Sequence, residues 1–139
     1  MNVTSKSIYA IIAVYELALN KDKFIKSDVI AKKYNIPKRF LEITLSELKT
    51  NGIVISKKGG GGGFALKKLP EEISIFDIIT ITENDLKVFN CSKFLEKSTC
   101  NTFTVFENLN TEIISLLKNK TIQDIINENT INFTTTFII

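Results

Sequence analysis

The sequence predicts a mainly α-helical chain with one small β-hairpin, and three observations support this. Apolar residues recur at helical spacing in the first fifty residues and again after Phe103. Between these regions, five consecutive glycines from Gly59 to Gly63 separate two short apolar segments. Glycine reaches positive φ without steric cost, so such a run is typical of a tight turn. The expected fold class is a winged helix-turn-helix, mainly α with a small β-hairpin wing, followed by a long dimerisation helix.

The segments that flank the glycines decide between three interpretations of the run. Residues 53–58 are β-branched and then basic, and residues 64–68 are apolar and then basic, which favours a hairpin with a cationic tip. A nucleotide-binding loop would need a following Lys-Ser or Lys-Thr, or a helix. Neither dipeptide follows the glycines, and Pro70 leaves no room for a helix directly after them. A flexible linker would lie between polar tracts. We therefore expect a wing.

Composition and charge define the broad class of protein. A chain of 139 residues with 44% apolar and 24% charged residues should form one compact domain, with or without an appended dimerisation segment. The net charge is only +3, but lysines and Arg39 concentrate between residues 30 and 70. No apolar stretch reaches the roughly 18 residues of a membrane span, and the N-terminus lacks the pattern of a signal peptide. We expect a cytoplasmic protein with no membrane contact.

The sequence contains no histidine. Histidine is the commonest general base and metal ligand, so its absence excludes a Ser-His-Asp or Cys-His nucleophile. No paired-carboxylate motif or nucleotide loop takes its place. We do not expect an enzyme.

Three helices are expected before the wing. Thr4 or Ser5 can cap the first, which ends near Asn20, and a short extended piece at Phe24 leads to the second, capped by Ser27. The apolar positions that define these two helices are Ile8, Ile11, Ile12, Tyr15 and Leu19 in the first and Val29, Ile30 and Tyr34 in the second.

The turn Asn35-Ile36-Pro37 begins the third helix, with Pro37 at its first position. This helix should run to Thr50, bury Phe40 or Leu41 together with Leu45 and Leu48, and end at Asn51-Gly52 in a left-handed cap. A short helix, a tight turn and a longer helix form a helix-turn-helix, whose second helix presents its N-terminal residues to DNA bases.

Those N-terminal residues are Lys38, Arg39 and Glu42. Exposed charges at a helix start are usually only solvated, but cations there oppose the helix dipole, which favours an anionic ligand. Arginine can bind guanine bidentately and glutamate can accept from cytosine, each worth about 1–3 kcal/mol of discrimination. The candidate DNA-binding set comprises Ser27, Lys38, Arg39, Phe40, Glu42, Lys49, Lys57, Lys58, Gly59, Gly60 and Gly61.

The C-terminal half predicts a dimerisation segment. Ser74 should cap a short helix, a loop follows from Thr82 to Asn90, and Thr121 should begin a last short helix. Between them, a long apolar stripe needs either a second copy or the chain's own domain to cover it. The stripe consists of Phe103, Phe106, Leu109, Ile113, Leu116 and Leu117. We expect a DNA-binding domain over 1–82, a sensor loop over 83–102, and the dimerisation helix with a tail over 103–139, of which 129–139 can pair at an edge or be disordered.

Several segments together resemble one protein family. They are Thr4-Ser5-Lys6 with Tyr9-Ala10, Phe40-Leu41-Glu42, the run from Leu48 to Val54, the wing ending in Phe64, Glu71-Glu72-Ile73-Ser74 with Asp77-Ile78-Ile79, and residues 121–125. This order is similar to that of the bacterial winged helix-turn-helix repressors that include the iron-sulfur cluster regulator, the nitric-oxide-sensitive repressor and the cysteine-metabolism repressor. The resemblance implies a homodimer that represses from palindromic operators on double-stranded DNA, in some members with an iron-sulfur cluster.

Cys91 and Cys100 match the first and last of the three cysteines that hold the cluster in such relatives, but the middle one is missing. At two other positions where relatives supply a ligand, this chain has Ile8 and Phe103, which cannot bind iron. Because a cluster usually takes four ligands, no cofactor is expected and the ligand set for an iron-sulfur cluster is incomplete. Three interpretations remain open: inert thiols, a redox pair favoured by Lys93 and Lys97, or a cluster completed by unusual ligands.

The sequence thus predicts a sequence-specific DNA-binding transcriptional regulator, a repressor, with Cys91 and Cys100 as the candidate sensor of redox state. The alternative is a regulatory module whose winged domain docks a protein. Salt separates the two, because DNA affinity falls with a slope of about 0.9 per phosphate neutralised, whereas an apolar protein interface responds little.

Overall fold

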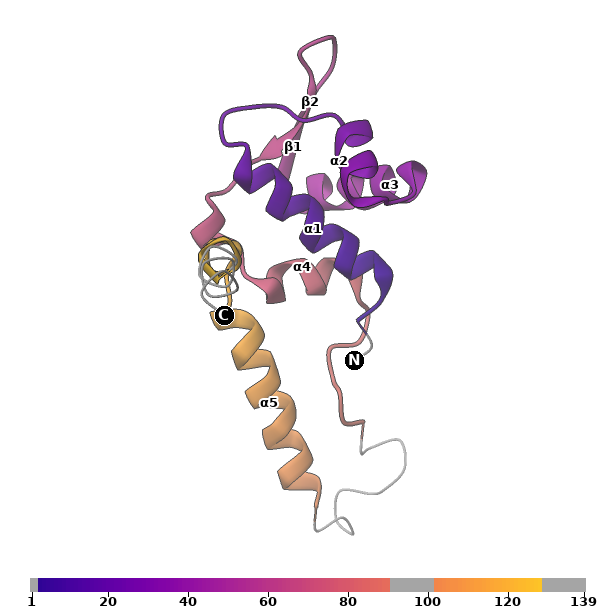
Figure 1. Ribbon diagram of the computed structural model, residues 1–139. Helices are drawn as coiled ribbons and strands as arrows, with labels where there is room; N and C mark the ends of the chain where they lie inside the picture. The colour runs from indigo at the N-terminus through magenta and orange to yellow at the C-terminus, as the bar shows by residue number, and fades with distance from the viewer. Residues whose placement is uncertain (1–2, 91–101, 129–139) are drawn as a thin grey trace, which may run out of the picture.

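The chain folds around its first helix, α1 (Ser5–Leu19), as the computed structural model in Figure 1 shows. The structure describes residues 3–90 and 102–128. Helix α2 (Ser27–Tyr34) and helix α3 (Lys38–Thr50) follow, then the antiparallel strands β1 (Val54–Lys57) and β2 (Gly63–Leu66). The 3-10 helix η1 (Pro70–Glu72), α4 (Ile75–Thr82), α5 (Phe103–Asn119) and a helix over 122–128 complete the described part. The predicted mainly α fold with a hairpin wing is confirmed.

The face of α1 that is buried differs from the stripe of large apolar residues in the sequence. Ala10, Ala13, Val14 and Leu17 are buried among the other core residues, whereas Ile8 is 45% exposed and Leu19 is also exposed. The small alanines allow α3 and α4 to pack closely against α1, and fully buried leucines of α3 fill the space between them. These leucines are Leu41, Leu45 and Leu48.

Most predicted helix ends are confirmed, and two shift by one residue. Ser27 is the first residue of α2 rather than its cap, which is Lys26, and Pro37 is the N-cap of α3 rather than its first helical residue. Pro37 has a ψ of 122°, because it closes the extended end of the turn before the helix begins. Asn35 is left-handed at φ 54°, and Gly52 at φ 78° ends α3 as expected.

The hairpin is wider than two strands, because the connection between α1 and α2 pairs with it. Ile25 and Phe64 exchange two backbone hydrogen bonds of 2.8 Å. This pairing explains Gly63, since a Cβ there would lie 2.4 Å from the Ile25 carbonyl oxygen and the residue has φ 134°. Only glycine fits a position with both constraints.

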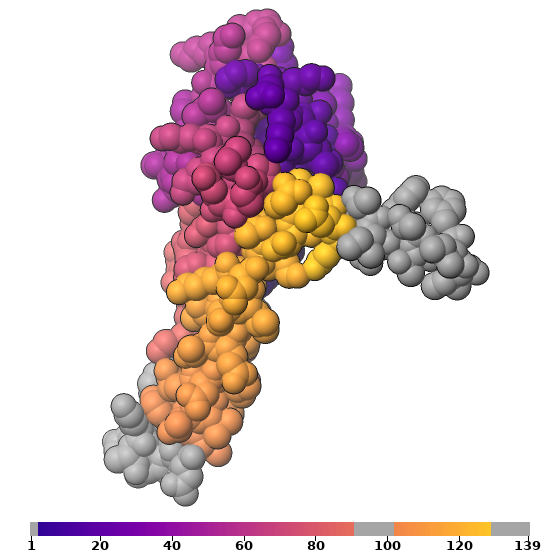
Figure 2. All heavy atoms as spheres, turned by 90° about the vertical axis from the view of Figure 1, so that its left-hand side faces the viewer, coloured from indigo at the N-terminus to yellow at the C-terminus, as the bar shows by residue number. Residues whose placement is uncertain are grey.

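Helix α5 extends away from the body, which we define as residues 3–82, and Figure 2 shows it in orange as an arm below the rounded upper part. The chain returns to the body after α5, where Ile75 donates to the Lys120 carbonyl and Ile122 donates to the Ile73 carbonyl. Ile122 is fully buried in the core. Ser74 and Thr121 begin their helices with reciprocal bonds to Asp77 and Asp124, as predicted.

Candidate nucleic-acid interface

The outer face of α3 is polar and exposed, and it lies opposite the face that fills the core. Lys38, Arg39 and Glu42 are exposed in the first turns of the helix, while Leu41 and Leu45 are buried beneath them. The helix-turn-helix therefore presents the predicted base-contacting residues to solvent. The buried leucines of the same helix fix the position of these exposed residues.

Ser27, Lys38 and Glu42 lie close together although they come from two helices. The Lys38 ammonium is 2.7 Å from Asp28 Oδ1 and 3.9 Å from Glu42 Oε1, and the Ser27 hydroxyl donates to Glu42 Oε1 at 3.3 Å. The hydrogen bond that the Lys38 ammonium donates to Asp28 holds the pKa of Asp28 below its usual range and raises the pKa of Lys38. Both side chains stay about half exposed, so water and a nucleic acid can reach them.

Arg39 has no ion-pair or hydrogen-bond partner within residues 3–90 and 102–128. Its guanidinium is thus free to take a planar acceptor. Phe40 instead packs its ring edge-to-face against Tyr9 of α1, with centroids 5.6 Å apart. The Lys49 ammonium donates to Ser56 Oγ at 2.6 Å and so joins α3 to β1.

The wing tip carries Lys57 and Lys58 beside the glycine run. Lys57 Nζ lies 5.8 Å from the centre of the Phe24 ring, and Lys58 is exposed. Gly59 needs its positive φ of 103°, whereas a Cβ added at Gly60 or Gly61 would meet nothing within 4 Å. The fold therefore does not require glycine at Gly60 or Gly61.

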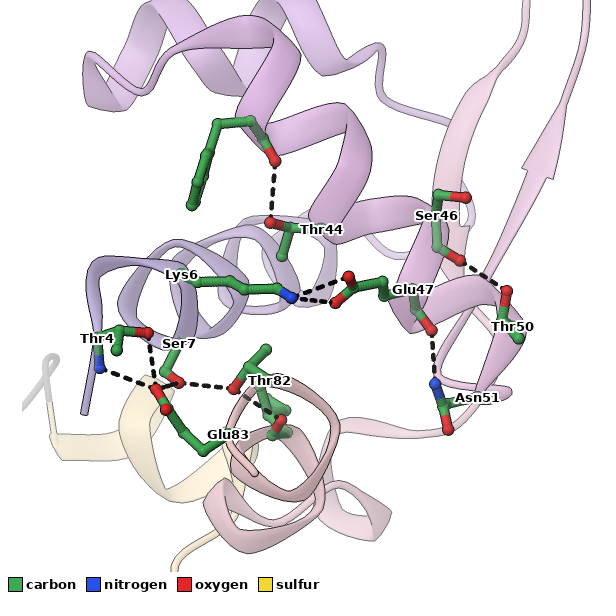
Figure 3. A network of polar contacts seen from close by, with 12 residues as sticks. Thr4, Lys6, Ser7, Thr44, Ser46, Glu47, Thr50, Asn51, Thr82 and Glu83 are labelled. Carbon is green, nitrogen blue, oxygen red and sulfur yellow. Dashed lines mark hydrogen bonds and ion pairs between the residues drawn. The ribbon is translucent and has the colours of Figure 1, made fainter. Parts of the chain in front are cut away.

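Polar contacts that the sequence did not reveal set the position of α1 against the other helices (Figure 3). Glu83 Oε1, just after α4, accepts from the Thr4 backbone amide at 2.9 Å and from the Thr4 hydroxyl at 2.7 Å, and also from the buried Ser7 hydroxyl. The Lys6 ammonium binds both oxygens of Glu47 on α3, at 2.8 and 2.7 Å. The two residues of each pair lie more than forty positions apart in the sequence, so their spacing does not predict these contacts.

A buried carboxylate joins α1 to α2. Glu16 is almost completely buried and accepts from Lys33 at 2.9 Å and from the Tyr34 hydroxyl. Burial raises the pKa of Glu16, but the hydrogen bonds from Tyr34 and Lys33 outweigh it and lower the pKa overall. These two contacts fix α2, the first helix of the helix-turn-helix, against α1.

Cys91 and Cys100 lie outside the described residues, so the structure does not place the predicted sensor. The described chain that precedes them is held against α5. Asn110, the only buried residue of α5, accepts from the Val88 and Phe89 amides at 3.1 and 2.9 Å and donates to the Phe89 carbonyl. The Phe89 ring stacks on Phe106 at 5.1 Å.

Within residues 3–90 and 102–128, no group of three or more His, Cys, Asp or Glu side chains is arranged to hold a metal ion. Ile8 on α1 and Phe103 at the start of α5 carry hydrocarbon side chains. A four-ligand iron-sulfur cluster from one chain does not fit this donor set, which has two cysteines and no histidine.

The predicted dimerisation stripe lies along α5 and is not buried by this chain. Leu116 is 70% exposed, and Phe103, Phe106, Leu109, Ile113 and Leu117 are partly exposed. Within the part of the chain that the structure describes, no helix is long and apolar enough to cross a bilayer.

A helix-turn-helix with a basic hairpin wing and an appended long helix defines a winged-helix transcriptional regulator. The comparisons with known proteins agree. The family model "Rrf2", described as an iron-dependent transcriptional regulator, matches residues 3–128. The chain belongs to the Rrf2 family of DNA-binding transcriptional regulators, whose members here are regulators and not enzymes.

Individual relatives cover nearly the whole chain. A protein of Aquifex aeolicus named as an HTH-type transcriptional regulator is 39% identical over 126 residues, covering 86% of this chain and 87% of the relative. The regulator IscR of Yersinia pseudotuberculosis is 30% identical over 94% of this chain and 82% of its own length. A crystal structure of a Listeria innocua transcriptional regulator superposes with a TM-score of 0.83 at 26% identity, covering 91% of this chain and 87% of that one. CymR of B. subtilis, at 23% identity and a TM-score of 0.79 over 90% and 95% of the two chains, shares the fold.

Proposed function

We propose that the chain is a homodimeric cytoplasmic repressor that binds a palindromic operator with two copies of α3 and two wings. The observation that carries the proposal is the outer face of α3, where Arg39, which has no partner among the described residues, lies beside the Lys38–Glu42 pair on a helix packed through its buried leucines. Arg39, Lys38 and Glu42 would read base edges. Lys57, Lys58 and the open glycines Gly60 and Gly61 would contact the backbone or minor groove.

The structure supports different tasks for the other predicted contacts. Ser27 orients Glu42 through its hydroxyl, Lys49 orients the wing through Ser56, and Phe40 sets α3 against α1. We infer that these three residues act by positioning, with their outer atoms available to phosphates.

Dimerisation through α5 supplies the second half-site. Leu116 of this stripe is 70% exposed and the other stripe residues are partly exposed, and a second copy would cover them with the same stripe. A two-fold pair would place the two copies of α3 about 34–36 Å apart, one helical turn of DNA.

The cysteine pair is the candidate for the signal. Both ends of the segment that carries Cys91 and Cys100 are attached to α5, through Phe89 at one end and Phe103 at the other. A peroxide would convert one thiolate to a sulfenic acid and release hydroxide, and the second thiol would displace water from it to form a disulfide. We propose that this bond changes the half-site spacing by acting on the start of α5.

Fluorescence anisotropy with duplexes tiled upstream of the chain's own gene tests the function. The expected result is tight binding to one duplex, with Arg39→Ala losing about ten- to a hundredfold for that duplex and little for scrambled DNA. Lys58→Ala should weaken both duplexes and reduce the salt slope by about one. Equal binding of all duplexes by wild type and Arg39→Ala would contradict sequence-specific recognition.

The same assay after peroxide treatment tests the sensor. We expect oxidation to abolish binding in wild type and to have no effect in Cys91→Ser. Binding indifferent to oxidation would identify inert thiols, and iron in anaerobically prepared protein would indicate a cluster instead.

A further inference from the structure

A cavity of about 420 Å³ lies at the base of the wing, on the side away from α3. The end of α1 and its connection to α2 form one wall, and the wing strands with the segment into η1 form the other. In Figure 1 these elements lie at the upper left, and α3 lies at the right. We call it the wing-base pocket. Its apolar lining includes Leu17, Phe24, Leu66 and Pro70, and its volume is in the range of small-molecule sites.

Four lysines surround this apolar lining: Lys21, Lys23, Lys67 and Lys68. None of their ammonium groups has an ion-pair partner in the described part of the chain, unlike Lys33 and Lys38. Two carboxylates also line the pocket, and that of Glu72 already accepts from the Leu69 amide at 3.2 Å. The four lysines outnumber the two lining carboxylates, Asp22 and Glu72, so the pocket carries an excess of positive charge.

We propose that the wing-base pocket binds a small organic anion with an apolar body, such as an aromatic carboxylate or sulfonate, and that this ligand regulates DNA binding. An apolar body would cover the lining, and the acid group would be neutralised by the lysines. A fully hydrated inorganic anion would gain nothing from the apolar walls, and a neutral apolar molecule would leave the lysines uncompensated. The part of this proposal that concerns regulation of DNA binding rests on the proposed function.

Contacts from the pocket lead to the wing and not to the recognition helix. The Phe24 ring lines the pocket and also lies under the Lys57 ammonium at 5.8 Å. The next residue, Ile25, pairs with Phe64 of β2. No residue of α3 lines the pocket. A ligand that displaces Phe24 would therefore move Lys57 and the wing, while the base-reading residues stay in place.

The test uses 1-anilinonaphthalene-8-sulfonate, an amphipathic aromatic anion whose fluorescence rises in apolar sites. We expect saturable binding to the full chain, with amide chemical-shift changes centred on Ala65 and Leu66. The variant Lys21→Gln/Lys67→Gln should weaken binding about tenfold or more through loss of charged contacts. The matched pair Lys32→Gln/Lys118→Gln removes the same charge elsewhere and should change nothing. Shifts confined to α5, or equal affinity in both double variants, would overturn the proposal.

DNA anisotropy with and without the dye separates the pocket from the proposed function. Saturating dye should change the affinity of wild type for DNA, and the Lys21→Gln/Lys67→Gln variant should lose this response. If wild type binds DNA and the dye occupies the pocket without effect, the regulatory half is wrong. If the dye binds as expected but no duplex binds at any salt concentration, the proposed function fails and the pocket stands.

Discussion

The body and α5 bury their apolar side chains in opposite ways. In the body, leucines and isoleucines from several helices are fully buried within one chain, whereas the only buried residue of α5 is the polar Asn110. The hydrophobic core therefore closes within one chain, with Ile122 packed against the body, whereas the apolar stripe on α5 stays partly exposed. In the function proposed above, recognition of DNA and assembly of a dimer are tasks of separate regions, so that each can be disturbed alone.

The largest effect is expected from a charge placed on the apolar stripe of α5. Leu116→Lys should leave the fold of the monomer intact, because Leu116 is already 70% exposed. In a dimer the ammonium would be buried in an apolar interface, so we expect a monomer by light scattering. Operator affinity should fall by about a hundredfold or more, since the second half-site no longer adds to binding.

Thr111→Lys, on the polar side of the same helix, is the control and should stay dimeric with normal affinity. If Leu116→Lys remains dimeric, a surface other than the α5 stripe holds the two copies together.

A substitution in the core of the body should lower stability without affecting the association of two copies. Leu45→Ala removes a fully buried side chain and should cost about 2–5 kcal/mol of unfolding free energy. Urea unfolding at two protein concentrations should give the same decrease relative to wild type, because this cavity lies within one chain. Ile43→Ala, at an exposed position of the same helix, should change stability by about 0.5 kcal/mol or less. A decrease that grows on dilution would mean that the body depends on its partner.

The order of the elements could be predicted from the sequence because local chemistry fixes it. Asn35 and Gly52 adopt the left-handed conformations that their residue types favour, and Ser74 forms the predicted N-cap of α4. The buried face of α1 was harder to predict from the sequence, because Ile8 is more hydrophobic than the alanines that pack in the core. Close approach of helices selects for small size as well as for hydrophobicity.

The chemistry of the candidate site was only partly predictable. Lys38 and Glu42 follow from their place at the start of α3, but the pairing of Lys38 with Asp28 depends on the angle at which α2 meets α3. The wing-base pocket lies between segments that are distant in the sequence, and the lysines that line it appear there only as ordinary surface charges.

Asn110 allows a finer test, because its side chain holds Val88 and Phe89 against α5. Asn110→Ala would leave the Val88 and Phe89 amides without their acceptor, a local cost of about 1–3 kcal/mol. Hydrogen exchange should rise at these two amides and stay unchanged at Ile122, which is bonded to the body. Asn110→Asp keeps the acceptor and loses the donor to the Phe89 carbonyl, so its effect should be intermediate. Unchanged exchange at Phe89 in Asn110→Ala would exclude this anchor.

The smallest expected effect concerns the DNA face of the body. Asp28→Asn removes the carboxylate that holds Lys38, so the ammonium becomes free to neutralise a phosphate. Affinity for scrambled DNA should rise several-fold and the salt slope should steepen by about one, with discrimination for the operator reduced. The dimer should persist, since Asp28 is far in sequence from the stripe and belongs to the body.

Glu71→Gln removes an exposed carboxylate of η1 and provides the charge-matched control for Asp28→Asn. Equal gains in the two variants would indicate a change of net charge alone, acting at long range on the DNA. A gain confined to Asp28→Asn would show that one acidic residue restrains the lysine at the start of α3, so that base contacts rather than phosphate contacts dominate recognition. Reduced affinity in Asp28→Asn would instead mean that the carboxylate orients Lys38 toward a base.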